Sequence, residues 1–337
     1  MFPSAVLLLM KTVSFNDKNK MVIAILLTII FARSAMGQDG EVSAYDSIWD
    51  RVVFYDDSHN NALKKFAFTG RLQGDYYNFD DSGESSESDF NWRRFRVGFK
   101  ASLFEGLTLH SEADMNLNNP QPLYKKLTDT NLAWTSPSGM TFKVGRQSAP
   151  FTLDGSTSSK KLYTLERSKV AGNLGFPTEY FPGITFSGKR DNWEYLAGLF
   201  SSDHGPEFEE AFDYGRFALF SLGYNFKEHL KMDNALVRLD YVNQSQDETN
   251  QTPHQKNAAS LVSKFERGRF HLWTDLSVSD GYGSRNDIVG LQFMPFYDIT
   301  DKTQVVFRYS YLKSSDGDSI RLSKYEKDLF GIRGNEA

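Results

Sequence analysis

The chain has 337 residues, a formal net charge of −5 at pH 7 and a mean hydropathy of −0.47, values too polar for a membrane protein built from helices. The absence of cysteine excludes a disulfide framework, a thiolate zinc site and a thiol nucleophile. Aromatic residues still make up 15% of the sequence, a content that fits a β-barrel with one lipid-facing surface, one wet surface and interfacial aromatic girdles.

Residues 1–37 have the order of a secretory signal peptide. Lys18 and Lys20 precede an apolar run over 21–31, and the small residues of Ala35-Met36-Gly37 follow as a cleavage site. The run is too short to span a bilayer, so a membrane anchor is the weaker interpretation. The leader holds four basic residues against one acid, a net of +3, so its removal changes the charge from −5 to −8. An acidic exported chain argues against nucleic acid as a partner.

Residues 38–65 are predicted to form a periplasmic N-terminal segment. The stretch over 39–63 is compatible with a short helix and equally with an extended plug, and the sequence alone leaves both open. After the leader, no apolar stretch approaches the length of a membrane helix.

From Phe66 onward, polar and apolar residues alternate with the period of two that half-buried β-strands require. In 305–312, for example, Phe307, Tyr309 and Tyr311 share one face of a strand. Soluble β-sandwiches alternate too, but many segments here run for about ten residues, the span of a tilted transmembrane strand. Thirteen such segments are predicted, over 66–78, 92–104, 107–116, 128–136, 139–146, 182–189, 192–201, 214–226, 234–245, 257–266, 268–279, 286–298 and 302–313.

The connections between these segments alternate in length. Long polar connections, such as 79–91 and 147–181, take turns with short ones, such as 105–106 and 190–191. Short periplasmic turns that alternate with longer extracellular loops are typical of bacterial outer-membrane barrels, which have an even number of strands. Thirteen is odd, and the tail over 313–337 lacks the strand pattern. We therefore expect this chain to be a fragment that lacks C-terminal strands.

Four short motifs lie in the block over 90–168: Val144-Gly145-Arg146, Pro150-Phe151, Thr157-Ser158-Ser159 and Glu166-Arg167-Ser168. In this block, and over most of the chain from about residue 64, the sequence resembles the phosphate-selective porin O and P family. The resemblance implies an all-β fold, a transmembrane antiparallel β-barrel of 16 strands when complete with about 13 present here, in the bacterial outer membrane. It also implies a homotrimer, and a barrel over 66–337 in which the loop 147–181 folds into the pore as a constriction.

The alternation predicts which charged side chains face the barrel interior. Arg94, Arg96 and Lys100 form a basic column on one strand. Such a column suits small oxyanions, because arginine pairs with phosphate through a planar fork of donors. The opposing interpretation is that the charges pair across strands and only keep the pore wet. The predicted inward basic residues are Arg71, Arg94, Arg96, Lys100, Lys143, Arg238, Lys264 and Arg308, and the inward acids are Asp75, Glu112, Asp114, Asp129, Asp240 and Asp275.

The predicted constriction loop and the turn before it add further basic residues. The turn contributes Arg146, and the loop contributes Lys160, Lys161 and Arg167. The family resemblance implies that the three loop residues belong to an anion site. An ordinary solvated loop rich in serine and lysine is the alternative, and the net acidic chain leaves a preference for cations open.

These features predict an outer-membrane porin through which small solutes, among them anions such as phosphate, diffuse passively. The alternatives are a plugged or structural (adhesin) barrel and a barrel lipid hydrolase. A hydrolase needs a Ser–His pair that faces lipid, whereas His110 and His271 are predicted to face inward. The histidines lack metal-ligand spacing and no serine stands in a nucleophile elbow, so we expect no catalytic residue, metal or cofactor. The expected partners are the solute, outer-membrane lipid and further copies of the chain.

Overall fold

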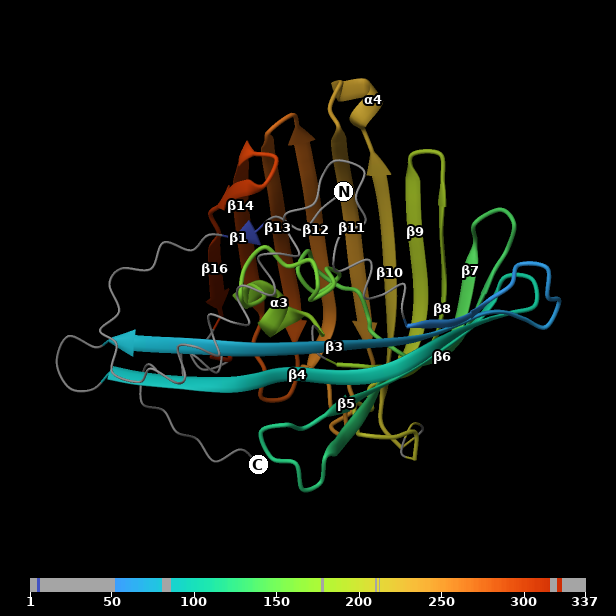
Figure 1. Ribbon diagram of the computed structural model, residues 1–337. Helices are drawn as coiled ribbons and strands as arrows, with labels where there is room; N and C mark the ends of the chain where they lie inside the picture. The colour runs from blue at the N-terminus through green and yellow to red at the C-terminus, as the bar shows by residue number, and fades with distance from the viewer. Residues whose placement is uncertain are drawn as a thin grey trace.

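The computed structural model describes residues 5–6, 52–80, 86–176, 179–209, 211, 213–315 and 320–322. They form one all-β sheet of 16 strands (Figure 1). The predicted signal peptide lies outside the described residues, apart from β1 (Ala5–Val6), which pairs in parallel with β15. None of the helices in the described part is long and apolar enough to cross a membrane.

Strands β2 to β15 form an antiparallel meander, in which each strand pairs with its neighbours in chain order, and β16 pairs with β14. All thirteen predicted segments coincide with strands, and β15 and β16, which both pair with β14, together correspond to the thirteenth. The strands are β2 (Val53–Asp56), β3 (Leu63–Asp80), β4 (Ser86–Leu103), β5 (Leu107–Met115), β6 (Tyr124–Thr135), β7 (Thr141–Gln147), β8 (Phe181–Arg190), β9 (Trp193–Ser201), β10 (Arg216–Asn225), β11 (Asn234–Gln244), β12 (Gln255–Arg267), β13 (Phe270–Gly281), β14 (Ile288–Thr300), β15 (Thr303–Val306) and β16 (Tyr309–Ser314).

One strand of the sheet was not predicted from the sequence. Part of the N-terminal stretch, for which a helix and a plug were both open, forms the short strand β2, and β2 pairs with β3. Within the described residues the sheet is not closed, because no pairing joins β2 at one edge to β15 or β16 at the other.

The register separates an apolar outer face from a polar inner face. Leu239, Leu261, Leu276 and Leu291 lie side by side across β11–β14, and between 39% and 53% of each is exposed. Exposed leucines in a continuous row are costly in water but are the expected surface toward lipid. One residue along β11, Asp240 is fully buried on the inner face. The alternation predicted from the sequence is therefore the alternation of the two faces of the wall.

The long connection between β7 and β8 lies against the inner face of the sheet and not on its outer face. It contains the short helix α3 (Lys169–Leu174), whose N-cap residue Ser168 accepts a hydrogen bond from the backbone N–H of Ala171. In Figure 1 this connection lies between β3 and β4 on one side and β11–β14 on the other. A second short helix, α4 (Lys227–Leu230), lies in the connection between β10 and β11.

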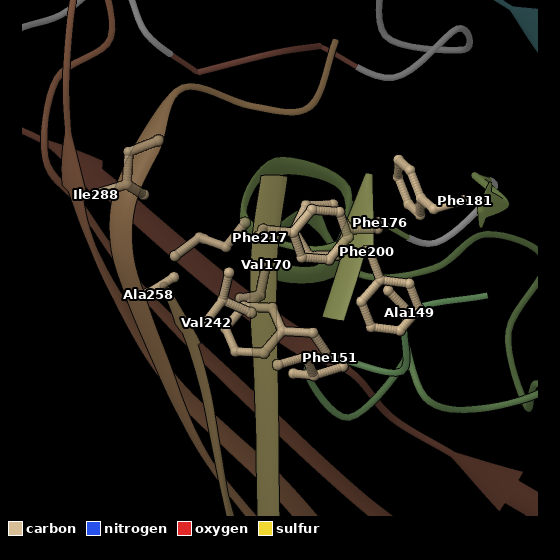
Figure 2. Close-up of a cluster of buried hydrophobic side chains, with 12 residues drawn as sticks. Ala149, Phe151, Val170, Phe176, Phe181, Phe200, Phe217, Val242, Ala258 and Ile288 are labelled. Carbon is tan, nitrogen blue, oxygen red and sulfur yellow. The ribbon is translucent and has the colours of Figure 1, made fainter. Parts of the chain in front are cut away.

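An apolar cluster attaches the long connection to the inner wall (Figure 2). Phe176 from the connection stacks on Phe217 of β10, with ring centroids 4.9 Å apart, and Phe217 stacks on Phe200 of β9 at the same distance. Phe151 and Val170 from the connection are also fully buried in this cluster. Burial of each such side chain contributes about 1.5–3 kcal/mol. The connection is therefore packed against the wall as a protein core is packed.

Candidate functional site

A polar cavity of about 260 Å³ lies between the long connection and the inner face of strands β3, β4 and β6. Four arginines line it, three from the wall and one from the connection, together with two acidic residues. The lining residues are Arg71, Arg94, Arg96 and Asp129 of the wall, and Ser148, Pro150, Gly155, Ser156, Thr157, Ser158, Ser159, Arg167, Phe176, Glu179 and Tyr180 of the connection.

Two of the wall arginines have neutral hydrogen-bond partners. The Nη1 of Arg71 donates to Ser159 Oγ, and the Nη1 of Arg94 donates to Gln73 Oε1 over 2.9 Å. The Nε of Arg71 is buried and has no hydrogen-bond partner in the structure. Among the described residues, neither side chain forms an ion pair with a carboxylate. The positive charges of both guanidinium groups are therefore not paired with a described carboxylate, and they can interact with an anion in the cavity.

Arg96 is held differently, by acidic residues of the next strand. Its guanidinium lies 3.5 Å from carboxylate oxygens of both Glu112 and Asp114 on β5. It also donates to the hydroxyl of Tyr180 over 2.6 Å and lies 5.1 Å from the centre of that ring. The charge of Arg96 is thus largely compensated, and its role is to fix Tyr180 at the edge of the cavity.

The alternation of polar and apolar residues did not predict that Arg93 faces inward, but the structure places it on the inner face. The β3–β4 register shifts between Gln73 and Gly74, and this bulge puts two consecutive arginines on the inner face. Arg93 pairs with Asp75 at 3.1 Å and with Glu166 of the connection at 2.9 Å. Its charge alone indicates that Arg93 faces inward, because an arginine on the lipid face costs about 2–4 kcal/mol at the bilayer midplane.

The connection contributes Arg167 to the cavity lining, and Lys160 directly follows the lining residue Ser159. Arg167 donates from Nε to the carbonyl of Asp154 over 2.9 Å and from Nη2 to the carbonyl of Thr157 over 3.0 Å. Burial lowers the pKa of Arg167, and the nearby Asp154 opposes that effect. Lys160 is exposed at the surface of the connection, and partial burial, followed by the positive charge of Arg71, lowers its pKa. Lys161 is exposed on the same turn.

The remaining predicted wall residues lie at other places on the inner face. Lys100 lies opposite His110, and Lys143 lies opposite Thr185, near the short turns. The Nζ of Lys264 lies 4.2 Å from the centre of the Trp273 ring on the wall formed by β12 and β13. These lysines belong to the inner face but do not line the arginine cavity.

Arg238 and Arg308 hold the connection from the wall that faces the cavity. Arg238 pairs with Asp240 at 2.8 Å and donates to Ser156 Oγ over 2.9 Å. Arg308 lies 3.4 Å from the carboxylate of Asp154 and donates to the carbonyl of Glu166 over 2.5 Å. Both arginines therefore serve as tethers of the connection.

Arg146 lies apart from all of these residues. It is fully buried, it donates to the backbone carbonyls of Gly205 and Glu207, and its guanidinium lies 6.0 Å from the centre of the Phe208 ring. It thus fixes the segment between β9 and β10 and does not line the cavity. Gly145, with a φ of +121°, precedes it in a backbone conformation open mainly to glycine.

A second cavity of about 360 Å³ lies where residues 250–254, 284–285 and 320–321 meet. Arg285 lines it and donates to the carbonyl of Asn173 at the end of α3 over 2.6 Å. Burial, and then the charge of Arg321, lowers the pKa of Arg285 to about 10. This cavity thus borders the end of α3.

Comparison with known proteins identifies the family. The family described as phosphate-selective porin O and P matches residues 66–259, and no curated relative matches the chain. Similar solved structures include OmpT, an outer membrane protein of Vibrio cholerae in trimer form, at 13% identity over 74% of this chain and 88% of that chain, with a TM-score of 0.39. A BenF-like porin from Pseudomonas fluorescens Pf-5 is 13% identical over 77% of this chain and 72% of that chain, also with a TM-score of 0.39. The family match covers more than half of the chain, which therefore belongs to the phosphate-selective porin O and P family of the bacterial outer membrane.

Proposed function

We propose that this porin favours small oxyanions, such as phosphate, among the solutes that diffuse through it. The observation that carries the proposal is the cavity of about 260 Å³ with its four arginines and its row of hydroxyl groups at 156–159. A water molecule occupies about 30 Å³ in the liquid, so the cavity has room for a small anion with part of its hydration shell.

The chemistry of the lining suits a tetrahedral oxyanion. Arginine presents several N–H donors in one plane, and charge-assisted hydrogen bonds to phosphate are about twice as strong as neutral ones. Arg71 and Arg94 form no ion pair with a described carboxylate, so an anion would supply the missing counter-charge. Asp129 and Glu179 limit the net positive charge, and a site of moderate affinity is what conduction requires.

In this proposal the loop 147–181 is the constriction. It contacts β3 through Arg71 and Ser159, and it contacts the facing wall through Arg308 and Glu166. Lys100 and Lys143 continue the basic inner face toward the short turns, which are periplasmic in outer-membrane barrels. An anion released from the arginines would meet these lysines next. The family resemblance supports a homotrimer embedded in outer-membrane lipid.

A plugged barrel is the second candidate, and one observation favours it. The apolar cluster of Figure 2 fills part of the interior with fully buried side chains. The lipid hydrolase gains no support, because His271 faces inward and binds Asp298 at 2.8 Å. Conductance separates a porin from a plugged barrel, since only a porin carries a steady ion current.

The experiment that tests the proposal is a reversal-potential measurement on the protein in planar bilayers under a KCl gradient. We expect chloride to permeate faster than potassium, and we expect added phosphate to reduce the chloride current. A preference for potassium, or a chloride current that phosphate leaves unchanged, would contradict the anion site and leave a general porin. No current at all would support the plugged barrel.

A further inference from the structure

A buried carboxylate on the wall that faces the arginine cavity holds the turn of the constriction loop. Asp275 of β13 is fully buried, and its Oδ2 accepts a hydrogen bond of 2.7 Å from the backbone N–H of Leu153. Its Oδ1 accepts hydrogen bonds from Ser260 over 2.8 Å and from Ser277 over 2.5 Å. Both oxygens of Asp275 are therefore used, and one of them is used on the loop backbone.

An ion pair on β11 holds the same turn from a second point. Arg238 binds both oxygens of Asp240, at 2.8 and 2.9 Å, so that its fork is fixed in the plane of a buried carboxylate. The Nη2 atom of Arg238 also donates to Ser156 Oγ over 2.9 Å and to the carbonyl of Thr152 over 3.4 Å. This leaves Arg238 engaged with the loop rather than with the solute.

The tethered turn continues directly into the lining of the arginine cavity. Ser156 and Thr157 line the cavity, and both hydroxyl groups donate to the carbonyl of Leu153, over 3.0 and 2.7 Å. The carbonyl of Thr157 in turn accepts from Arg167, which lines the cavity as well. The turn is tight, because a Cβ atom on Gly155 would lie 2.0 Å from the carbonyl oxygen of Phe151. A displacement of Leu153 would therefore move the cavity lining with it.

We infer that Asp275 and the Arg238–Asp240 pair are positioning residues of the anion site, which set the width and the anion preference of the passage from the opposite side of the loop. They contact no solute. Their contribution is to hold the turn at 152–157, and through it the hydroxyl groups and Arg167, at a fixed distance from the arginines of β3 and β4. The anion part of this inference rests on the proposed function, whereas the effect on passage width does not.

The test measures two quantities for each variant in planar bilayers: the single-channel chloride conductance and the phosphate concentration that halves it. Asp275→Asn removes the negative charge of the acceptor and replaces one of its two oxygens by an N–H₂ group, which weakens the hydrogen bond that holds the backbone N–H of Leu153. We expect the chloride conductance to rise and the half-blocking phosphate concentration to increase about tenfold, the equivalent of one charge-assisted hydrogen bond. Asp280→Asn is the matched control, since Asp280 is an exposed carboxylate on the same strand.

A second variant changes the geometry of the contact without changing its charge. It also tests the inference if Asp275→Asn does not fold into the membrane. Arg238→Lys keeps the positive charge beside Asp240 but loses the planar fork that reaches Ser156, and we expect it to shift both quantities in the same direction. Asp275→Asn added to Arg71→Gln should increase the half-blocking concentration much less than it does alone, because the site it positions is already weakened. Variants that match Asp280→Asn in both quantities, or fully additive effects, would overturn the inference. Absence of phosphate block in the parent protein would refute the proposed function, and the conductance of the variants would still test the positioning role.

Discussion

Arg71 on β3 and Arg96 on β4 lie directly opposite each other, so two guanidinium groups occupy one cross-strand position of the inner wall. Like charges in such a position repel each other. Glu112 and Asp114 compensate Arg96, whereas Arg71 donates to the hydroxyl of Ser159 on the loop. This cross-strand pair therefore has one compensated and one uncompensated arginine, and both line the cavity. An anion between Arg71 and the loop would relieve the repulsion.

Replacement of Arg71 should weaken phosphate binding. Arg71→Gln removes a charged donor that has no carboxylate partner, and we expect the half-blocking phosphate concentration to increase about tenfold. The measurement is the phosphate titration of chloride current in planar bilayers. Arg216→Gln is the control, because Arg216 is exposed and lies next to the inward Phe217 on β10, so the same charge is removed from the outer face. An equal effect of the two variants would show that only net charge matters.

The affinity for anions should fall at alkaline pH, and Lys160 should account for part of the fall. Its pKa is lowered by partial burial and by Arg71, so it loses its positive charge at a lower pH than a lysine fully surrounded by water does. The anion is therefore bound best below this lowered pKa and less well as the pH rises through it. Sulfate is the suitable blocking ion, because its own charge does not change in this range. We expect Lys160→Gln to flatten the alkaline part of the pH profile, and a profile with the parent's slope would contradict this role.

Much of the inner face could be predicted from the sequence, because a strand has a period of two and lipid excludes charge from the other face. Arg94 and Arg96 were placed correctly for this reason. Arg93 was missed because a bulge, which adds one residue to a strand, shifts the alternation without a distinct sequence motif. The tethers of the loop could not be predicted at all, since Asp275 and Leu153 are 122 positions apart and meet only after the barrel wall curves around the loop.

The apolar cluster should be needed to hold the long connection between β7 and β8 against the inner wall. Phe176→Ala removes the ring that stacks on Phe217 and lies 5.6 Å from the Phe181 ring. Loss of a buried phenylalanine costs about 3–5 kcal/mol. Here this loss reduces the free energy that holds the long connection against the wall. We expect faster protease cleavage within 148–180 and a larger chloride conductance, with little change in the strand content measured by circular dichroism. Phe220→Ala is the control, because Phe220 lies on the outer face of β10 and is 49% exposed. Equal cleavage rates in the two variants would show that the cluster does not retain the loop.

Arg146 should matter for stability and not for anion selectivity, in contrast to the role predicted from its position before the loop. Its guanidinium satisfies the backbone carbonyls of Gly205 and Glu207. Arg146→Gln leaves these buried acceptors without their charged donor, at a cost of about 1–3 kcal/mol for each group. We expect a lower free energy of unfolding in urea for the detergent-solubilised protein, and a half-blocking phosphate concentration equal to that of the parent. Arg190→Gln, an exposed arginine at the end of β8, provides the control for the change in net charge. If Arg146→Gln instead weakened the phosphate block as strongly as Arg71→Gln does, the solute would have to pass beside Arg146, and the arginine cavity would not be the selective part of the pore.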